Sequence, residues 1–146
     1  MRKLSFITCT LMLFFSLQIS LSAQTTATWQ GGKPGKVADW SCAANWKEGR
    51  MPDAFSLVLI PSGRAFYPVI RGKVPPIDAL LVESGALLTL QKNSSLCILG
   101  ETGRLGGIIL LGEIRNSGRL EFGNLPEWNI AQLQHIQGAG AVLSSR

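Results

Sequence analysis

Histidine is nearly absent from the sequence, because His135 is the only one among 146 residues. A serine-hydrolase site needs a histidine beside its nucleophile, and no serine here lies in a Gly-x-Ser-x-Gly turn. Structural zinc sites need cysteine and histidine at close spacings, and the chain has no Cys-x-x-Cys pair. These scarcities argue against nucleophilic catalysis and against a metal centre, so we expect a protein without enzyme activity and without a cofactor.

Charged residues are also few, at 16% of the chain, and the basic ones do not cluster. The 14 Lys and Arg residues exceed the 9 Asp and Glu residues, but two of the 14, Arg2 and Lys3, lie at the N-terminus. Surfaces that bind nucleic acid gather basic residues on one face, often with aromatic residues between them. The scattered pattern therefore predicts no nucleic-acid partner. We attribute the small excess of positive charge to solubility.

The sequence lacks an apolar run of the usual transmembrane length. Its longest run, Phe6–Leu21, is interrupted by threonine, serine and glutamine, whereas a spanning helix needs about 20 predominantly apolar residues. Two cationic residues before it and small residues after it are typical of a secretory signal peptide. We therefore predict that residues 1–23 are removed after Ala23. The mature chain would then have no membrane span and be secreted or lie in the periplasm or at the cell surface. The alternative is an uncleaved membrane anchor.

Cysteine is scarce too, and one of the three, Cys9, lies inside the predicted signal peptide. Export to an oxidising compartment makes a disulfide between Cys42 and Cys97 a candidate. Closing that loop would stabilise the fold by about 4 kcal/mol in the chain-entropy description. The alternative is two separate buried thiols that act as small apolar side chains. The sequence leaves both open.

Glycine is plentiful, and the mature chain changes character near residue 76. Residues 24–76 are rich in tryptophan, proline and turn residues, and residues 77–146 are short β-prone runs broken by glycine. Strands are expected at 56–60 and at 65–70, the second at a sheet edge because it contains proline. Residues 130–137 have the only helix-like spacing and could equally form a strand. The length suits one domain, a capping segment followed by repeats.

A repeated turn motif suggests how that domain is built. Small residues and a glycine precede an apolar residue at Gly85, Gly103 and Gly118, with a looser copy at Gly140. These intervals, in the middle to high teens, indicate an all-β fold, a short right-handed parallel β-helix or β-solenoid, in which each coil buries its apolar face on the next. Leu87, Leu105 and Leu120 would then form one interior column. The alternative is an antiparallel β-sandwich with similar turns.

Three of the four tryptophans, Trp29, Trp40 and Trp46, fall within one short, turn-rich segment. An open stack of strands needs a cap at each end, and these indole rings could cover the first coil. They could instead form an exposed platform for sugar rings, since exposed tryptophan is costly unless it is used. At the other end Phe122 and Trp128 could finish the stack. Without such caps the ends would favour end-to-end self-association.

The motifs of this segment resemble those of a known group of proteins. Trp29-x-Gly-Gly, Ala44-Asn45-Trp46 and Val58-x-Ile60-Pro61, followed by the repeat Leu80–Leu90, resemble secreted bacterial β-solenoid proteins of the Bacteroidetes type and passenger domains like those of autotransporters. The resemblance covers residues 21–122 and implies a scaffold or adhesin-like role. We expect this chain to differ from most members of the group in being far shorter and in having no counterpart of their frequent C-terminal sorting domain.

Acidic residues are the remaining candidates for chemistry. Glycoside hydrolysis needs two carboxylates about 5–9.5 Å apart, and Glu83 and Glu101 would lie one coil apart if the repeat is interpreted correctly. Glu113 and Glu121 are further candidates. Each is more simply a solvated turn residue, with Arg104 and Arg119 near enough to pair. Three aspartates could hold calcium but lack the alternating oxygen ligands of a calcium loop; they are Asp39, Asp53 and Asp78.

These observations favour an exported, non-catalytic β-solenoid with a structural or adhesive role at the bacterial cell envelope, whose partners are glycans or other envelope proteins. A carbohydrate-binding module that uses Trp29, Trp40 and Trp46 is the first alternative. A fragment of a β-helical polysaccharide-degrading enzyme is the second.

Overall fold

A computed structural model describes residues 24–124 and 127–145, apart from the side chains of residues 127–130. The predicted signal peptide lies outside these residues. The described chain is all-β, with three short 3-10 helices beside its strands. The helices are η1 (Ala43–Asn45), η2 (Arg104–Gly107) and η3 (Glu127–His135).

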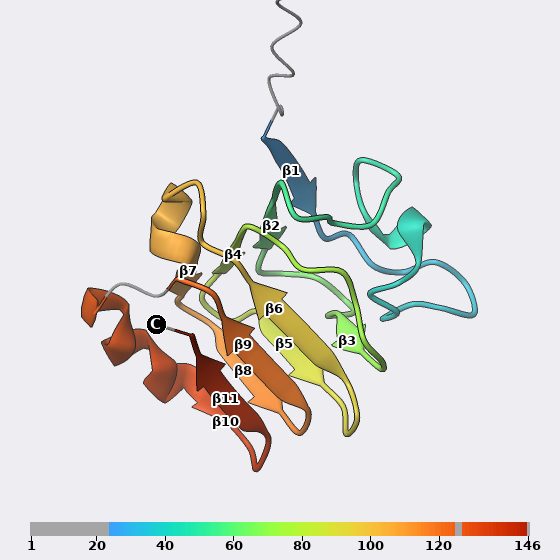
Figure 1. Ribbon diagram of the computed structural model, residues 1–146. Coiled ribbons are helices and arrows are strands. Elements are labelled where there is room, and N and C mark those ends of the chain that lie inside the picture. Colours follow the sequence, from blue (N-terminus) through green and yellow to red (C-terminus); the bar gives the residue numbers. More distant parts are fainter. Residues whose placement is uncertain (1–23, 125–126, 146) are drawn as a thin grey trace, which may run out of the picture.

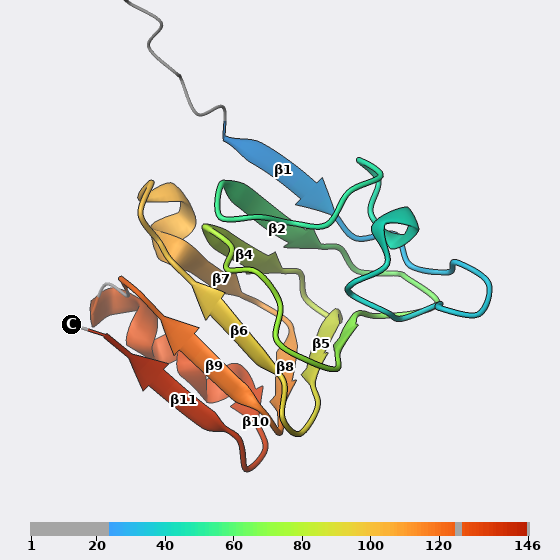
Figure 2. The ribbon, with the colours of Figure 1, turned by 45° about the vertical axis from the view of Figure 1, so that its right-hand side comes forward.

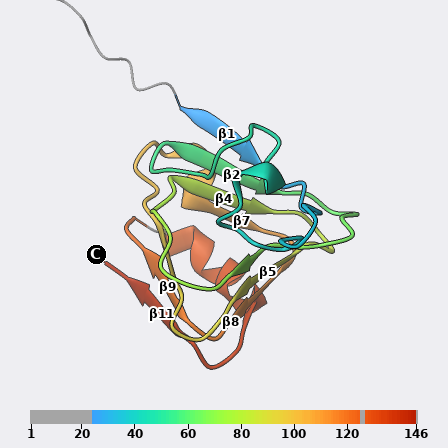
Figure 3. The same cartoon turned by 90° about the vertical axis from the view of Figure 1, so that its right-hand side faces the viewer.

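Eleven strands form three sheets that surround one interior (Figures 1 and 3). Sheet 1 contains, in spatial order, β1 (Thr25–Thr28), β2 (Ser56–Ile60), β4 (Ala79–Val82) and β7 (Ile108–Leu110). Sheet 2 contains β3 (Val69–Ile70), β5 (Leu87–Leu90), β8 (Glu113–Asn116) and β10 (Ile136–Gln137). Sheet 3 contains β6 (Ser95–Ile98), β9 (Arg119–Phe122) and β11 (Ala141–Ser144).

Every pair of these strands is parallel, so the antiparallel sandwich that we held as the alternative is wrong. The chain passes from sheet 1 to sheet 2 to sheet 3 and then returns to sheet 1, as β4, β5 and β6 are followed by β7, β8 and β9. One such passage is called a coil below. Parallel neighbours need a crossover of this kind because a tight turn cannot join them.

The true period is longer than the repeated turn motif suggested. Leu80 pairs with Ile108, and Leu96 pairs with Leu120, so a strand and its partner are further apart in sequence than neighbouring motif glycines are. The motif glycines lie at three different corners: Gly85 between β4 and β5, Gly103 between β6 and β7, and Gly118 between β8 and β9. Similar turn chemistry therefore recurs at corners that are not equivalent.

The interior consists of columns of apolar side chains, one residue from each coil. Strand burial alternates, because successive side chains point to opposite faces of a sheet. Val58, Leu80 and Ile108 follow one another in register and are fully buried. Each such side chain stabilises the fold by about 1.5–3 kcal/mol.

The column that we predicted from Leu87, Leu105 and Leu120 does not exist. Leu87 points outward from β5 in sheet 2, and Leu105 lies in η2 rather than in a strand. Leu120 is buried in sheet 3, between Leu96 and Val142. The error follows from the misread period, because residues at non-equivalent corners cannot stack.

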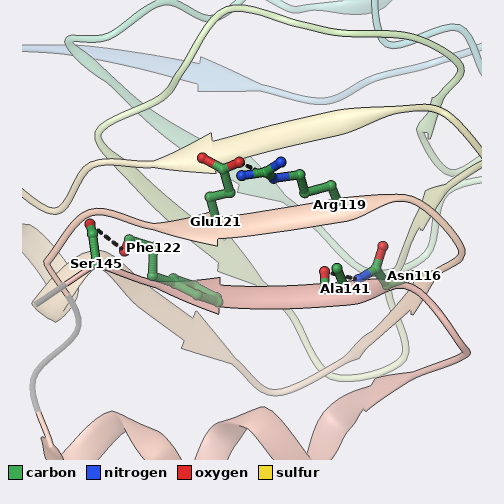
Figure 4. Close-up of polar contacts among 6 residues, drawn as sticks. All are labelled: Asn116, Arg119, Glu121, Phe122, Ala141 and Ser145. Atoms are coloured by element: carbon green, nitrogen blue, oxygen red, sulfur yellow. Dashed lines mark hydrogen bonds and ion pairs between the residues drawn. The ribbon is translucent and has the colours of Figure 1, made fainter.

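The corners of successive coils approach closely, which restricts the residues that fit there. A Cβ atom on Gly118 would lie 2.5 Å from the carbonyl oxygen of Ser94, in the corner of the preceding coil. At the same corner Asn116 is buried, accepts a hydrogen bond from the Gly118 N–H (3.0 Å) and donates to the Ala141 carbonyl of the next coil (2.9 Å; Figure 4). Glycine and asparagine thus fix the spacing between coils at this corner.

The two ends of the stack differ. At the N-terminal end the outer edge of β1 is partly occupied, since the Thr28 carbonyl accepts a hydrogen bond from the Lys47 N–H (2.9 Å) and the Thr28 N–H donates one to the Glu48 carboxylate (2.8 Å). At the other end η3 packs beside β7, whose Leu110 N–H donates to the side chain of Gln132 (2.7 Å). Strand β11 lies at the free edge of sheet 3 (Figure 2). All of its residues are exposed.

Residues 24–76 are not a separate packing unit. Their strands β1 and β2 belong to the same sheet as β4 and β7, and one buried cluster runs through both segments. No boundary of the core falls at residue 76. For residues 130–137 the sequence left a helix and a strand open. The stretch contains some of each, because the 3-10 helix η3 ends at His135 and the strand β10 follows directly. The side chain of Trp128, a predicted cap residue, lies outside the described part of the chain.

Candidate functional site

The tryptophans near the N-terminus form a buried cluster. Trp29, Trp40 and Trp46 are at most 1% exposed. Trp46 is central, because its ring lies edge-on to Trp29 (5.1 Å between centroids, 80°) and to Trp40 (4.8 Å, 82°). Edge-to-face pairs of this kind contribute about 0.5–1.5 kcal/mol each beyond the area that they bury.

Backbone pairing places two of these rings on top of the interior columns. The Trp29 N–H donates to the Leu59 carbonyl (2.9 Å), which continues the β1–β2 ladder and aligns Trp29 with Ile60. The Trp40 N–H donates to the Val69 carbonyl (3.2 Å), which aligns Trp40 with Ile70 of sheet 2. The rings therefore occupy interior positions in the first coil.

The indole N–H groups of Trp29 and Trp46 and the side chain of Asn45 are hydrogen-bonded within the protein. Trp29 Nε1–H donates to the Phe66 carbonyl and Trp46 Nε1–H to the Trp40 carbonyl, both at 2.8 Å. Asn45 is fully buried: its side chain accepts from the Lys33 N–H and donates to two further backbone carbonyls of the loop. This explains why an asparagine precedes Trp46, a role that the sequence did not reveal.

The burial of these rings contradicts the sugar platform that we considered for Trp29, Trp40 and Trp46. A ring stacks on a sugar only if one face is open to solvent, and none of the three offers such a face. Their closed packing is that of a hydrophobic cluster at the start of the stack.

The carboxylates considered for catalysis do not occupy equivalent positions. Glu83 follows β4, and its carboxylate accepts hydrogen bonds from the N–H and the hydroxyl of Ser62 (2.9 and 3.2 Å). Glu101 follows β6, at a different corner. The expected one-coil relation between Glu83 and Glu101 is therefore wrong, for the same reason as the leucine column.

The aspartates considered for calcium each accept hydrogen bonds from nearby protein groups. Asp39 accepts from the Ser41 N–H, and Asp53 from the Phe55 N–H and the Ser56 hydroxyl. Asp78 is buried and accepts from the backbone of residues 101 and 102 and from the Thr102 hydroxyl. Among the described residues no three His, Cys, Asp or Glu side chains converge as a metal site.

Cys42 and Cys97 are free thiols in the described chain. Cys97 points outward from β6 next to Glu121 of β9. Burial, and to a smaller degree the negative charge of Glu121, raise the pKa of the Cys97 thiol. Cys42 lies directly before η1.

A groove of about 650 Å³ lies on the outer face of sheet 2. Leu87 pairs with Glu113 in register, and His135 precedes Ile136, the partner of Ile114. Tyr67 lies two positions before Val69, the partner of Thr89. Leu87 and Glu113 are thus outward partners, Tyr67 and His135 lie one or two residues before the paired residues of the neighbouring coils, and all four, called the outward column below, line the groove.

Both polar and apolar side chains surround this column. Arg115 belongs to the next outward position of β8, and its Nε donates to Glu113 at 2.9 Å in an exposed ion pair. Gln134 and Gln137 add two carboxamides from the ends of η3 and β10, and Leu111 adds an exposed apolar side chain at the β7–β8 corner. The site combines one aromatic ring, one balanced charge pair and several neutral hydrogen-bonding groups.

The sequence did not reveal this groove. Glu113 and His135 were considered singly, and Tyr67 lies in a different part of the sequence from both. Their alignment depends on the length of each coil, which the glycine motif misstates. The alternation of outward residues in Leu87–Leu90 and Glu113–Asn116 was the one available signal.

Comparison of the chain with protein-family models, curated proteins and solved structures found no match. No helix among the described residues has the length and apolar character to cross a membrane.

Proposed function

We propose that the chain is a short right-handed parallel β-solenoid that is exported and serves a structural or adhesive role at the bacterial cell envelope. The observation that carries this proposal is the regular passage of the chain through three parallel sheets, with residues one coil apart in register. Parallel crossovers are right-handed in about 98% of cases, which sets the expected hand.

Export is supported by residues 1–23, which have the charged start, apolar run and small-residue end of a signal peptide. An extended, rigid surface is useful outside the cell because repeat folds present long faces to partners. Kinship with secreted bacterial β-solenoid proteins, suggested by the tryptophan and repeat motifs, belongs to the same proposal.

A non-catalytic role is supported by the carboxylates. Glu83 is hydrogen-bonded to Ser62, and Glu101 stands at another corner, so this pair does not face a common substrate position. The fragment of a polysaccharide-degrading enzyme is therefore the weaker interpretation. Glycans or other envelope proteins remain the proposed partners.

Self-association is proposed at the β11 end. Residues 136–145 carry no charge, and Val142 and Leu143 are each 42% exposed on a free edge strand. Edge strands usually carry charges that prevent pairing with other chains. Wild-type protein should therefore show concentration-dependent dimers by light scattering, and Val142→Lys should remain monomeric. A monomer at all concentrations would contradict this part.

The envelope role is tested by expressing the complete chain in a Gram-negative host beside a variant that lacks residues 2–23. We expect the complete chain in the periplasmic or surface fraction, with an N-terminus at Gln24 by mass spectrometry. Cells that express the complete chain should adhere more strongly to surfaces coated with cell-envelope material than cells that express the variant without residues 2–23. Retention of the complete chain in the cytoplasm, or equal adhesion of both strains, would refute the proposal.

A further inference from the structure

We infer that the groove on sheet 2 binds a linear neutral glycan, with successive sugar rings lying across successive coils. The inference deepens the proposed adhesive role and rests on it for its biological meaning. It assigns the contacts to Tyr67, Glu113, Arg115 and His135 and not to the buried tryptophans.

The length of the groove suits a chain of several sugar units. Neighbouring strands in a sheet lie about 4.8 Å apart, so the column from Tyr67 to His135 spans three such steps, roughly 14 Å. One pyranose ring in an extended glycan has about the length of one step. Side chains on adjacent coils can therefore contact adjacent sugars in the same way.

The floor of the groove offers what the C–H faces of sugar rings require. Tyr67 is half-buried at one end and presents an aromatic ring that is held against the core. Leu87 and Leu111 add aliphatic surface in the middle, and Leu111 is 59% exposed. Ligand sites commonly combine such apolar surface with a few placed polar groups.

The polar groups match neutral hydroxyls better than charged ligands. The carboxylate of Glu113 accepts, the guanidinium of Arg115 donates, and the carboxamides of Gln134 and Gln137 do both. Because Glu113 already pairs with Arg115, the groove has no surplus positive charge to attract a phosphate or an acidic polymer. Vicinal hydroxyls, which donate and accept together, fit this mixture.

A peptide is the less suitable occupant. Peptides that bind to sheets usually add a strand at a free edge, where backbone groups are unpaired. Strands β5 and β8, which form the floor, are interior strands of sheet 2 and are paired on both sides. Recognition must therefore come from side chains alone.

The test is isothermal titration calorimetry of the secreted chain with cellohexaose, xylohexaose, mannohexaose and laminarihexaose, and with hexagalacturonate as an acidic probe. We expect at least one neutral hexasaccharide to bind, and hexagalacturonate to bind more weakly. Glu113→Gln and Tyr67→Ala should each weaken binding by about tenfold or more, the usual effect of losing one anchoring contact. Glu113→Gln keeps the size of the side chain and remains informative if Tyr67→Ala disturbs the core.

Glu121→Gln is the matched control, because Glu121 pairs with Arg119 on the outer face of sheet 3 (Figure 4). Glu113 pairs with Arg115 on sheet 2 in the same way. The affinity of the Glu121→Gln variant for the neutral hexasaccharide should stay within about twofold of wild type, because no contact with the glycan is lost. No binding to any neutral probe, preference for hexagalacturonate, or equal affinity of Glu113→Gln would overturn the inference. Glycan binding by a chain that fails to reach the envelope would refute the proposed function alone.

Discussion

Trp46 is the residue whose removal should damage the fold most at the N-terminal end. It is 1% exposed, contacts two other indole rings edge-on, and donates its Nε1–H to the Trp40 carbonyl at 2.8 Å. Trp46→Ala removes all three contributions at once. If the ring were a surface platform, the same substitution would have little effect on stability.

The size of the effect follows from these contacts. Truncation of a buried tryptophan to alanine costs about 3–5 kcal/mol. The Trp40 carbonyl also loses its donor, and a buried group without a partner costs about 1–3 kcal/mol. Because part of that cost is already included in the first range, we expect a loss of about 4–5 kcal/mol. The total stability of a domain of this size is about 5–15 kcal/mol.

The measurement is guanidinium-induced unfolding of the chain without residues 1–23, followed by far-ultraviolet circular dichroism so that the signal does not depend on tryptophan. Trp46→Phe keeps an aromatic ring but has no donor, and it should lose about 1–3 kcal/mol. Phe55→Ala is the control, since Phe55 is 48% exposed and its removal should cost less than about 1 kcal/mol. A Trp46→Ala loss no larger than that of Phe55→Ala would refute the packing argument.

Further predictions concern the corners and the free thiol. Gly118→Ala should destabilise the chain by about 1–3 kcal/mol, because its Cβ would overlap a carbonyl of the adjoining corner, whereas Gly72→Ala, with open space around it, should be nearly neutral in the same unfolding assay. Asn116→Ala removes the partly buried hydrogen bonds to the Gly118 N–H and the Ala141 carbonyl and should cost about 1–3 kcal/mol; a smaller loss than for Gly72→Ala would contradict it. Cys97 should react slowly with iodoacetamide at neutral pH, since a raised pKa reduces its thiolate fraction. Glu121→Gln should lower the pH midpoint of that reaction only in part, because burial is the larger cause. Mass spectrometry of the alkylated peptide measures both rates.

Strands could be predicted because short β-prone runs between turn residues are too short to form stable helices. The predicted strand at 56–60 coincides with β2, whereas only the last two residues of the strand predicted at 65–70 form β3. The all-β class follows from many such runs. The period was not predictable, because Gly85, Gly103 and Gly118 satisfy similar turns at different corners. Turn chemistry reports local backbone geometry and carries no information about which corners lie above one another.

The role of the tryptophans was open for a related reason. The composition indicates that the three indole rings are either buried in the protein or exposed to bind a ligand. Which of the two occurs depends on the loop that folds over them. Asn45 organises that loop through hydrogen bonds to backbone groups at Lys33, Lys36 and Asp39. Its importance is invisible in sequence, because an asparagine in a polar turn usually faces solvent.

Coil length varies along the stack, since the pair Leu80–Ile108 is more widely separated in sequence than the pair Val58–Leu80 in the same sheet, and this has an evolutionary consequence. Extra residues are taken up outside the core, as η2 shows, while the inward side chains stay in register. If one coil were duplicated, Leu80 would stack on a second copy of itself. The existing columns already stack aliphatic side chains on aliphatic side chains, so the copied coil would fit. Proteins of this architecture can therefore lengthen by duplication of a coil, without a new kind of interface between coils. The length of the stack can then evolve independently of the residues on its outer face.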